Sequence, residues 1–342
     1  SNLYLTAGTS YYNFSVSSIV GTAVDSPADI NLIEVAISSN SASDGDTAWY
    51  NGTAFGSALG AAGVYRSTAT FTDNAPGAND LWTSTLAFPL SLMEHGKTYK
   101  SKVRTTDKAS PALVRNQDFT FRYDVIHPTA NVTVPANDLS TNAVITVKGN
   151  ITDDIAAWGI STVAVSIEKI GGGANPCYGG SSFNASCPNW LGVSGALTDW
   201  SYAVTWNTGF KYVITARASD NAGNVQSIFT IPTSSRSFTY DTAGPTVSIA
   251  NTAARARTLS SITGASSDSP AGVTRVEMRI RQLASTACGD NVNKWWNKTN
   301  AFDATDDAPG ALAAFFDATP NPTWTSWSVS SAAANVDSGC RY

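Results

Sequence analysis

The chain of 342 residues has two histidines and 26 acidic residues with which to do acid–base or metal chemistry. His95 stands before a glycine, His127 lies in a segment with proline, and no nucleophile motif accompanies either one. A Ser-His-Asp triad needs a histidine that a third group orients beside the nucleophile. We therefore interpret both histidines as structural or solvent-exposed, and we expect no histidine-based metal site.

Paired carboxylates could instead hydrolyse a glycosidic bond, which requires two of them about 5 to 10 Å apart. The conspicuous acids are Asp25, Asp153 and Asp268, and each follows a glycine at the same spacing. An acid that recurs in this way is more typical of a turn or a cap than of a catalyst. The sequence therefore predicts a protein that is not an enzyme.

Calcium is the more serious chemical alternative. Four acids lie at the expected joints between repeats or on the turns that precede them: Asp107, Asp124, Asp220 and Asp241. Carboxylate and carbonyl oxygens are the ligands that Ca²⁺ takes in proteins. No dense run of alternating acids is present at the joints, so the expectation is a chain without a cofactor, with Ca²⁺ at the joints as the alternative.

Aromatic residues in the long loops offer a possible glycan or partner site, because exposed aromatic rings stack on sugars. The candidates are Trp49, Tyr50, Trp190, Trp295 and Trp296. The opposing interpretation is core packing, the usual place of large aromatic side chains. It applies best to three tryptophans that precede a Gly-x-x-Tyr motif by comparable intervals, namely Trp82, Trp200 and Trp327.

The four cysteines fall into two local pairs, Cys177 with Cys187 and Cys288 with Cys340. Neither spacing resembles a zinc knuckle. We predict two disulfides, which implies an oxidising compartment. The alternative is four unrelated buried thiols.

These residues lie on a pattern that occurs three times in the same order. Gly-x-x-x-Asp is followed by an alternating apolar run and then by Gly-x-x-Tyr, at a period that indicates a tandem array. The three copies are Gly21–Asp25, 33–37 and Gly96–Tyr99; Gly149–Asp153, 163–167 and Gly209–Tyr212; and Gly264–Asp268, 276–280 and Gly339–Tyr342. Alternation with β-branched residues is the signal of a strand.

The boundaries between the copies are visible as a strand that ends in Tyr-Asp, a short connector with proline, and a new strand. These boundaries predict domains at 1–124, 125–243 and 244–342. Proline stiffens so short a linker, so we expect an extended, semi-rigid rod. The third copy stops at the start of a late strand, and two strands would be missing. We expect a fragment of a longer array, and the alternative is that another chain supplies the strands.

The second copy resembles the bacterial Ig-like repeats of very large surface and secreted proteins. The residues that carry this resemblance are 209–224 (GFKYVITARASDNAGN) and 238–245 (FTYDTAGP). The resemblance implies an all-β fold of tandem immunoglobulin-like sandwiches. In such sandwiches a tyrosine at a glycine corner packs inward and bonds its hydroxyl to nearby backbone, which we expect of Tyr99, Tyr212 and Tyr342. Arg104 and Arg217 lie on the alternate face, where each could pair with an acid.

Composition narrows the function further. The net charge of −5 excludes a nucleic-acid partner, because there is no basic surface to neutralise phosphates. No apolar run approaches the roughly 18 residues that a membrane span needs, so we expect no membrane insertion in this segment.

We therefore predict a non-catalytic stalk or filament segment of a large bacterial extracellular or cell-surface protein. Its partners would be neighbouring Ig-like domains of the same or an identical chain. One alternative is an adhesin that binds a glycan or a protein through its long loops. Another is a polymer subunit completed by strand exchange.

Overall fold

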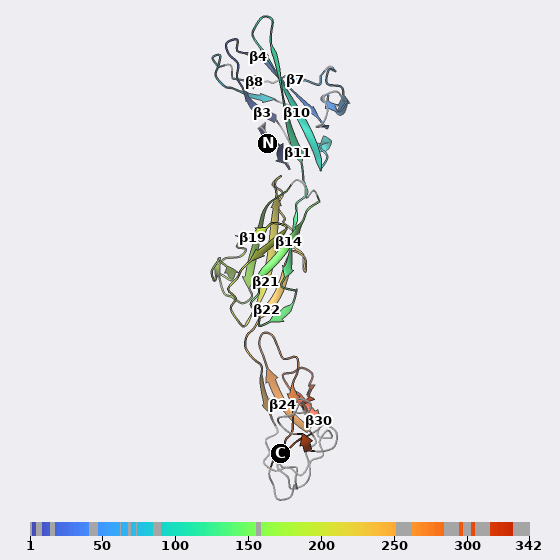
Figure 1. Ribbon diagram of the computed structural model, residues 1–342, viewed down its shortest axis with the longest axis vertical. Coiled ribbons are helices and arrows are strands. Elements are labelled where there is room, and N and C mark those ends of the chain that lie inside the picture. Colours follow the sequence, from blue (N-terminus) through green and yellow to red (C-terminus); the bar gives the residue numbers. More distant parts are fainter. Residues whose placement is uncertain are drawn as a thin grey trace.

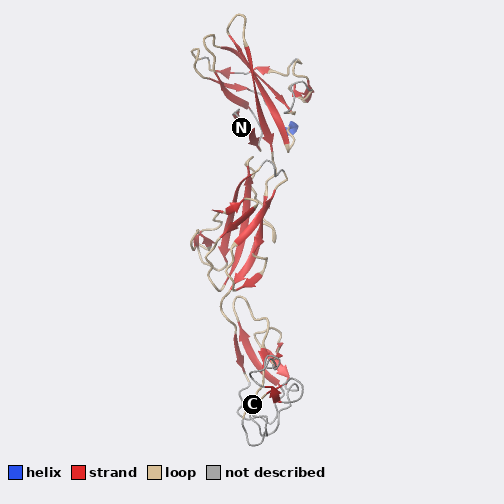
Figure 2. Ribbon diagram, viewed as in Figure 1, coloured by secondary structure: helices blue, strands red, loops and turns tan. Residues whose placement is uncertain are grey.

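The computed structural model describes residues 2–4, 9–13, 18–40, 47–61, 63–67, 70–72, 74–84, 90–154, 159–250, 261–283, 294–296, 302–304 and 315–330, and every structural statement below concerns these residues. Figure 2 shows that they form strands and loops, together with the short 3-10 turn η1 (Leu90–Leu92). The strands fall into three sets along the chain, which we call unit 1 (β1–β11), unit 2 (β12–β22) and unit 3 (β23–β30).

Unit 1 consists of two sheets. One has the strand order β1-β3-β9-β8, and the other has the order β2-β11-β10-β4-β5-β6, with β7 also paired to β4. The strands are β1 (Asn2–Tyr4), β2 (Thr9–Tyr12), β3 (Ser18–Ala23), β4 (Ile30–Ser38), β5 (Trp49–Tyr50), β6 (Phe55–Ser57), β7 (Arg66–Ser67), β8 (Thr70–Phe71), β9 (Asp80–Ser84), β10 (Lys97–Asp107) and β11 (Val114–Tyr123).

Unit 2 repeats this strand order, although its first strand β12 is antiparallel to β14 whereas β1 is parallel to β3. Its sheets have the orders β12-β14-β20-β19 and β13-β22-β21-β15-β16-β17, with β18 paired to β15. The strands are β12 (Thr129–Val134), β13 (Leu139–Thr141), β14 (Val147–Thr152), β15 (Ile160–Lys169), β16 (Cys177–Tyr178), β17 (Phe183–Ala185), β18 (Leu191–Gly192), β19 (Ser194–Ala196), β20 (Asp199–Tyr202), β21 (Phe210–Asp220) and β22 (Ser235–Tyr240).

Unit 3 repeats the smaller sheet in the order β23-β24-β30-β29, and two further strand pairs, β25 with β28 and β26 with β27, follow the pattern of the larger one. The strands are β23 (Thr246–Ile249), β24 (Ser261–Ser267), β25 (Glu277–Met278), β26 (Trp295–Trp296), β27 (Phe302–Ala304), β28 (Phe316–Asp317), β29 (Thr319–Pro320) and β30 (Trp327–Ser330). Tyr342 lies outside the described residues.

The strand order of units 1 and 2 is that of an immunoglobulin-like sandwich. A four-stranded sheet faces a larger sheet whose central strands, β10 or β21, are long and antiparallel to both neighbours. Alternate residues of β21 are buried, from Tyr212 to Asp220, as expected of a strand that turns one side to a core. The fold is therefore all-β and Ig-like, as the sequence predicted.

Each unit buries its own tryptophan against the glycine of its Gly-x-x-x-Asp motif. The cross-strand partners are Gly21 with Trp82, Gly149 with Trp200 and Gly264 with Trp327. A Cβ built on these glycines would lie 2.6, 2.1 and 2.2 Å from the indole ring. The three tryptophans are at most 2% exposed, so the interpretation of these residues as core is correct.

The expected tyrosine corner is present in both units where the structure describes it. Gly96 and Gly209 adopt φ of 80° and 83°, the left-handed region that glycine enters without strain. The Tyr99 hydroxyl accepts the Glu94 amide at 2.8 Å. The Tyr212 hydroxyl accepts the amide of Asn207 at 2.9 Å and donates to its carbonyl at 2.7 Å.

Figure 1 shows the three units in chain order along the longest axis of the molecule, joined by two short connections. The first connection follows β11 at Asp124, and the second follows β22 at Asp241. Both aspartates are buried, at 1% and 5% exposure. Because a buried acid needs a hydrogen-bond or charged partner, other side chains must meet these two aspartates at the joints.

Candidate functional site

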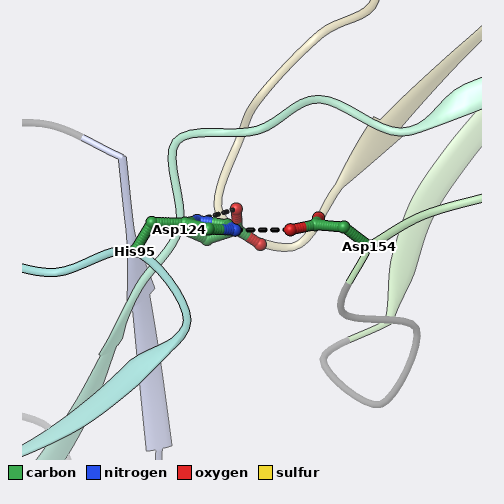
Figure 3. A group of neighbouring side chains, drawn as sticks. All are labelled: His95, Asp124 and Asp154. Carbon is green, nitrogen blue, oxygen red and sulfur yellow. Dashed lines mark hydrogen bonds and ion pairs between the residues drawn. The ribbon is translucent and has the colours of Figure 1, made fainter.

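Three side chains from different elements meet at the joint between units 1 and 2. His95 precedes β10, Asp124 follows β11, and Asp154 follows β14 of unit 2. The Nδ1 atom of His95 lies 3.2 Å from Asp124 Oδ1, and its Nε2 atom lies 2.5 Å from Asp154 Oδ2. Figure 3 shows the imidazole between the two carboxylates. We call these three residues, together with the nearby Asp153 and Asp220, the joint cluster.

Asp124 is bonded to both units. Its backbone amide donates to Tyr12 of unit 1, and its backbone carbonyl accepts the Asn224 Nδ2 of unit 2 at 3.0 Å. Its Oδ1 accepts the amide of Ile126 in the connection. Burial raises the pKa of Asp124, and the nearby carboxylates of Asp220 and Asp154 act in the same direction.

Asp220 reaches the cluster from the end of β21. Its two carboxylate oxygens accept the backbone and side-chain amides of Asn224, at 2.9 and 2.8 Å. Gly223, at φ 89°, closes the turn between them. This is the tight turn that the Asp-Asn-Ala-Gly-Asn sequence predicts, and it holds Asn224 where it binds Asp124.

Asp153 adds a fourth carboxylate, and one of its oxygens has no hydrogen-bond partner. Oδ1 accepts the amide of Asp154 at 3.1 Å, whereas Oδ2 is buried and accepts nothing. Burial raises the pKa of Asp153 to about 6, and the charges of Asp124, Asp154 and Asp220 add to this effect. The joint cluster therefore concentrates negative charge in a partly buried place.

The ligand atoms of His95, Asp124 and Asp154 all lie within 4.8 Å of one another. In the described part of the chain, these three residues form the group of histidine, cysteine and acidic side chains that could hold a metal ion. His95, interpreted from the sequence as structural or solvent-exposed, contacts acids from both units.

The structure brings together two of the four acids that were expected at the joints. Asp124 and Asp220 lie in the same cluster. Asp107 does not, because it ends β10 whereas His95 precedes it, and an 11-residue strand separates them by about 30 Å. The Asp107 carboxylate accepts the amides of Ala109 and Leu113 and so closes its own turn.

The second joint has a different chemistry. Asp241 Oδ1 accepts the amide of Ala243, as Asp124 Oδ1 accepts that of Ile126. Its Oδ2 accepts the amide of Ala271 in unit 3. The position before the glycine corner, held by His95 in unit 1, is Thr208 in unit 2, and its hydroxyl accepts the amide of Thr242.

Three of the five aromatic residues expected to bind a glycan or partner are buried. Trp49, Tyr50 and Trp296 are at most 3% exposed. Trp49 and Tyr50 lie on β5, which pairs with β4 and β6 of the larger sheet, and Trp296 lies on β26, which pairs with β27. The expectation of exposed stacking platforms was therefore wrong for these three, because their rings pack against the protein itself.

Trp190 and Trp295 are partly exposed, but arginines occupy one side of their rings. The Arg217 guanidinium lies 4.2 Å from the Trp190 ring centre, and that of Arg279 lies 3.7 Å from Trp295. In unit 1 Arg104 stacks on Tyr65 at 3.7 Å and pairs with Glu34. The expected pairing with an acid thus holds for Arg104, whereas Arg217 contacts an aromatic ring.

Unit 2 also contains a disulfide, and unit 1 contains a cavity. Cys177 and Cys187 form a disulfide within the loop between β15 and β18, and Cys288 and Cys340 lie outside the described residues. A cavity of about 500 Å³ in unit 1 is lined by Glu34, Arg104 and Tyr65, together with the loop residues Leu59, Gly60, Ala61 and Gly63. The Arg104–Glu34 ion pair already satisfies its charged groups.

Neither a family model nor a curated protein matches the sequence. Among solved structures, the chain is similar to the fibronectin(III)-like modules of Clostridium thermocellum CbhA, at 13% identity and a TM-score of 0.33, covering 69% of this chain and 93% of that one. It is also similar to a tetra-tandem repeat in the extending region of a large adhesion protein, at 15% identity and a TM-score of 0.25, covering 96% of this chain and 65% of that one. Chicken CNTN1 FN1–FN3 domains match at 9% identity and a TM-score of 0.23, over 94% and 88% of the two chains. At these scores the similarity supports no argument about function, and the fold assignment rests on strand order.

Proposed function

We propose that this chain is a non-catalytic, extracellular structural segment in which Ig-like domains are held end to end. The domains are 1–124, 125–243 and 244–342. Three observations support this division. The sheets do not run from one unit into the next, each unit has its own cluster of core residues, and the connections fall at Asp124 and Asp241.

The main support for the proposal is the set of contacts between units 1 and 2 at the first joint. Asp124 is almost wholly buried where the units meet, and side chains of unit 2 bind it and His95. A loose linker would leave such an acid in water. Inter-domain contacts of this kind restrict the relative motion of domains that would otherwise move, so the joint sets a spacing and a direction.

The setting of the segment follows from its chemistry. A disulfide in a loop persists in oxidising environments, and this supports an extracellular or cell-surface location. That the parent protein is a large bacterial one rests on the resemblance of residues 209–224 to bacterial Ig-like repeats. Among the described residues, no helix is long and apolar enough to cross a bilayer. The partners are neighbouring Ig-like domains of the same or an identical chain, and a glycan or protein partner at the loops is the second candidate.

Distance measurements between units 1 and 2 test the proposal. Spin labels on the full chain at exposed positions of β11 and β19, for example Arg115 and Ser194, should give one narrow distance distribution. Replacing Val125 and Ile126 in the connection by glycine should broaden it. A broad distribution in the unchanged protein would contradict a structural role based on a fixed joint.

The glycan alternative is tested separately. Trp190 and Trp295 are the two expected platform residues that keep part of their surface exposed. If the protein binds glycans on an array and Trp190→Ala or Trp295→Ala removes the signal, the loops have a recognition function beside the structural one.

A further inference from the structure

We propose that the joint cluster is a binding site for one divalent cation of the zinc or manganese class, with His95, Asp124 and Asp154 as its protein ligands. Two of these ligands belong to unit 1 and one to unit 2, so the cation would connect the units. The inference deepens the proposed structural role, and it concerns the first joint alone.

The first argument is electrostatic. The Asp124 and Asp154 carboxylates, one from each unit, both lie against the His95 imidazole, and Asp124 is only 1% exposed. Buried charges require a counter-charge or a metal ion. One divalent cation would balance the two carboxylates that contact His95.

The second argument is the buried Oδ2 of Asp153, which has no hydrogen-bond partner. An orphaned carboxylate oxygen is costly unless a cation lies near. Asp25, at the same position of unit 1, also has a buried Oδ2 without a partner. In the described part of unit 1, however, no group of metal ligands gathers around it, and Asp25 therefore serves as a matched control.

The third argument is the hydrogen bonding of His95. Its Nδ1 lies 3.3 Å from the Val125 amide, which donates to it, and 3.2 Å from Asp124 Oδ1. A nitrogen that accepts a hydrogen bond carries no proton, so the proton is then on Nε2. Nε2 faces Asp154 Oδ2, and a metal ion could replace the proton there while Nδ1 keeps the bond from Val125.

The identity of the cation follows from its ligands. Ca²⁺ takes six to eight oxygen ligands and rarely a nitrogen, whereas imidazole together with carboxylates suits Zn²⁺ and, with more oxygens, Mn²⁺. Bonds of about 2.0 to 2.2 Å around such an ion place its ligand atoms within about 4.4 Å of one another. Ligand atoms within 4.8 Å reach this geometry by small movements.

The second joint shows what the site depends on. Thr208 stands in the place of His95, and Ser269 stands in the place of Asp154. Neither offers an imidazole or a carboxylate, and the Asp241 carboxylate is satisfied by two backbone amides. The metal ligands are therefore a property of one joint and not of the repeat.

Titration calorimetry of the full chain, treated with a chelator and then dialysed, tests the site with Zn²⁺, Mn²⁺, Ca²⁺ and Mg²⁺ in turn. We expect one Zn²⁺ or Mn²⁺ per chain. The substitutions His95→Thr and Asp154→Ser, which copy the second joint, should each weaken binding at least tenfold. His127→Gln and Asp25→Asn should leave it unchanged. Thermal unfolding of the same variants shows that they are folded.

Three results would overturn the proposal. Zn²⁺ binding that His95→Thr and Asp154→Ser leave unchanged would be adventitious. Binding of Ca²⁺ alone, unaffected by His95→Thr, would mean that the ligand assignment is wrong. No binding of any of the four ions would mean that the three side chains contact one another without a metal. The spin-label distances in chelator keep the two proposals apart, because a joint that stays narrow without metal supports the structural role alone.

Discussion

The glycines of the Gly-x-x-x-Asp motif are required by close packing. In unit 2 a Cβ on Gly149 would lie 2.0 Å from the Asn131 carbonyl oxygen and 2.1 Å from the Trp200 ring. Both contacts are far inside van der Waals distance, and the first is with backbone, which cannot rotate away. This explains why the glycine recurs with the tryptophan in all three units.

Gly149→Ala should therefore destabilise unit 2 by about 2 kcal/mol or more, the scale of overpacking in a core. Gly192→Ala is the control in the same unit, because a Cβ there would meet nothing within 4 Å. Denaturant unfolding followed by tryptophan fluorescence measures both. Equal stability of the two variants would contradict the packing argument.

We expect the free energy of unfolding of unit 2 to fall at alkaline pH because of Tyr212. Burial raises the pKa of this hydroxyl to about 12 in the folded protein, against about 10 when the chain is unfolded. The folded state thus favours the protonated form. Its contribution is fully present below pH 10 and is lost as the pH rises towards 12, by up to about 2 to 3 kcal/mol.

The measurement is the free energy of unfolding at pH 8 to 12, with Tyr212→Phe as the comparison. We expect the variant to lose less stability over this range than the unchanged protein does, although it starts lower because Asn207 loses both of its bonds to the hydroxyl. Parallel pH profiles would show that this tyrosine is not the group that titrates.

The long loops are elements that fold back onto the larger sheet. In units 1 and 2 an aromatic loop residue stacks with an arginine of the central strand, Tyr65 with Arg104 and Trp190 with Arg217. In unit 3 Trp295 stacks with Arg279, which follows β25. Trp190 also packs at 5.7 Å on Phe229. These contacts anchor the loops and cover one side of each aromatic ring.

Removing the disulfide loosens the same loop of unit 2. The replacement of Cys177 and Cys187 by serine should cost about 2 to 3 kcal/mol, because the bridge closes a short loop whose freedom in the unfolded chain then returns. Thermal unfolding of the double variant with and without reductant measures this loss. If reductant destabilises the variant as much as it destabilises the unchanged protein, another bridge accounts for the effect.

The orientation of the units is set by contacts at the joints. In metal-free protein, the His95–Asp154 pair and the Asn224–Asp124 bond connect units 1 and 2. Asp154→Ser should therefore broaden the spin-label distance distribution across the first joint and leave that across the second joint unchanged. An unchanged first joint would mean that the buried Asp124 is sufficient to hold it.

Most of the fold could be predicted from sequence, and the joint cluster could not. The repeated Gly, Trp and Tyr positions predicted core and corner correctly, because packing within one sandwich imposes them in each copy. His95 and Asp154 are 59 positions apart, and neither residue type recurs at the matching position of the second joint. The signals that were present, a histidine before a glycine corner and an Asp-Asp pair after a strand, are ordinary in isolation.

The amino-acid sequence by itself determined the all-β class and the repeated glycine, tryptophan and tyrosine positions of the sandwich, since alternation and glycine act over a few residues. Only the tertiary structure decided which acids meet, which tryptophans are covered and what the histidine contacts. The physical reason is that units 1 and 2 contribute separate halves of the joint cluster. Charges that are harmless on each half become a partly buried, unbalanced site only when the two ends pack together.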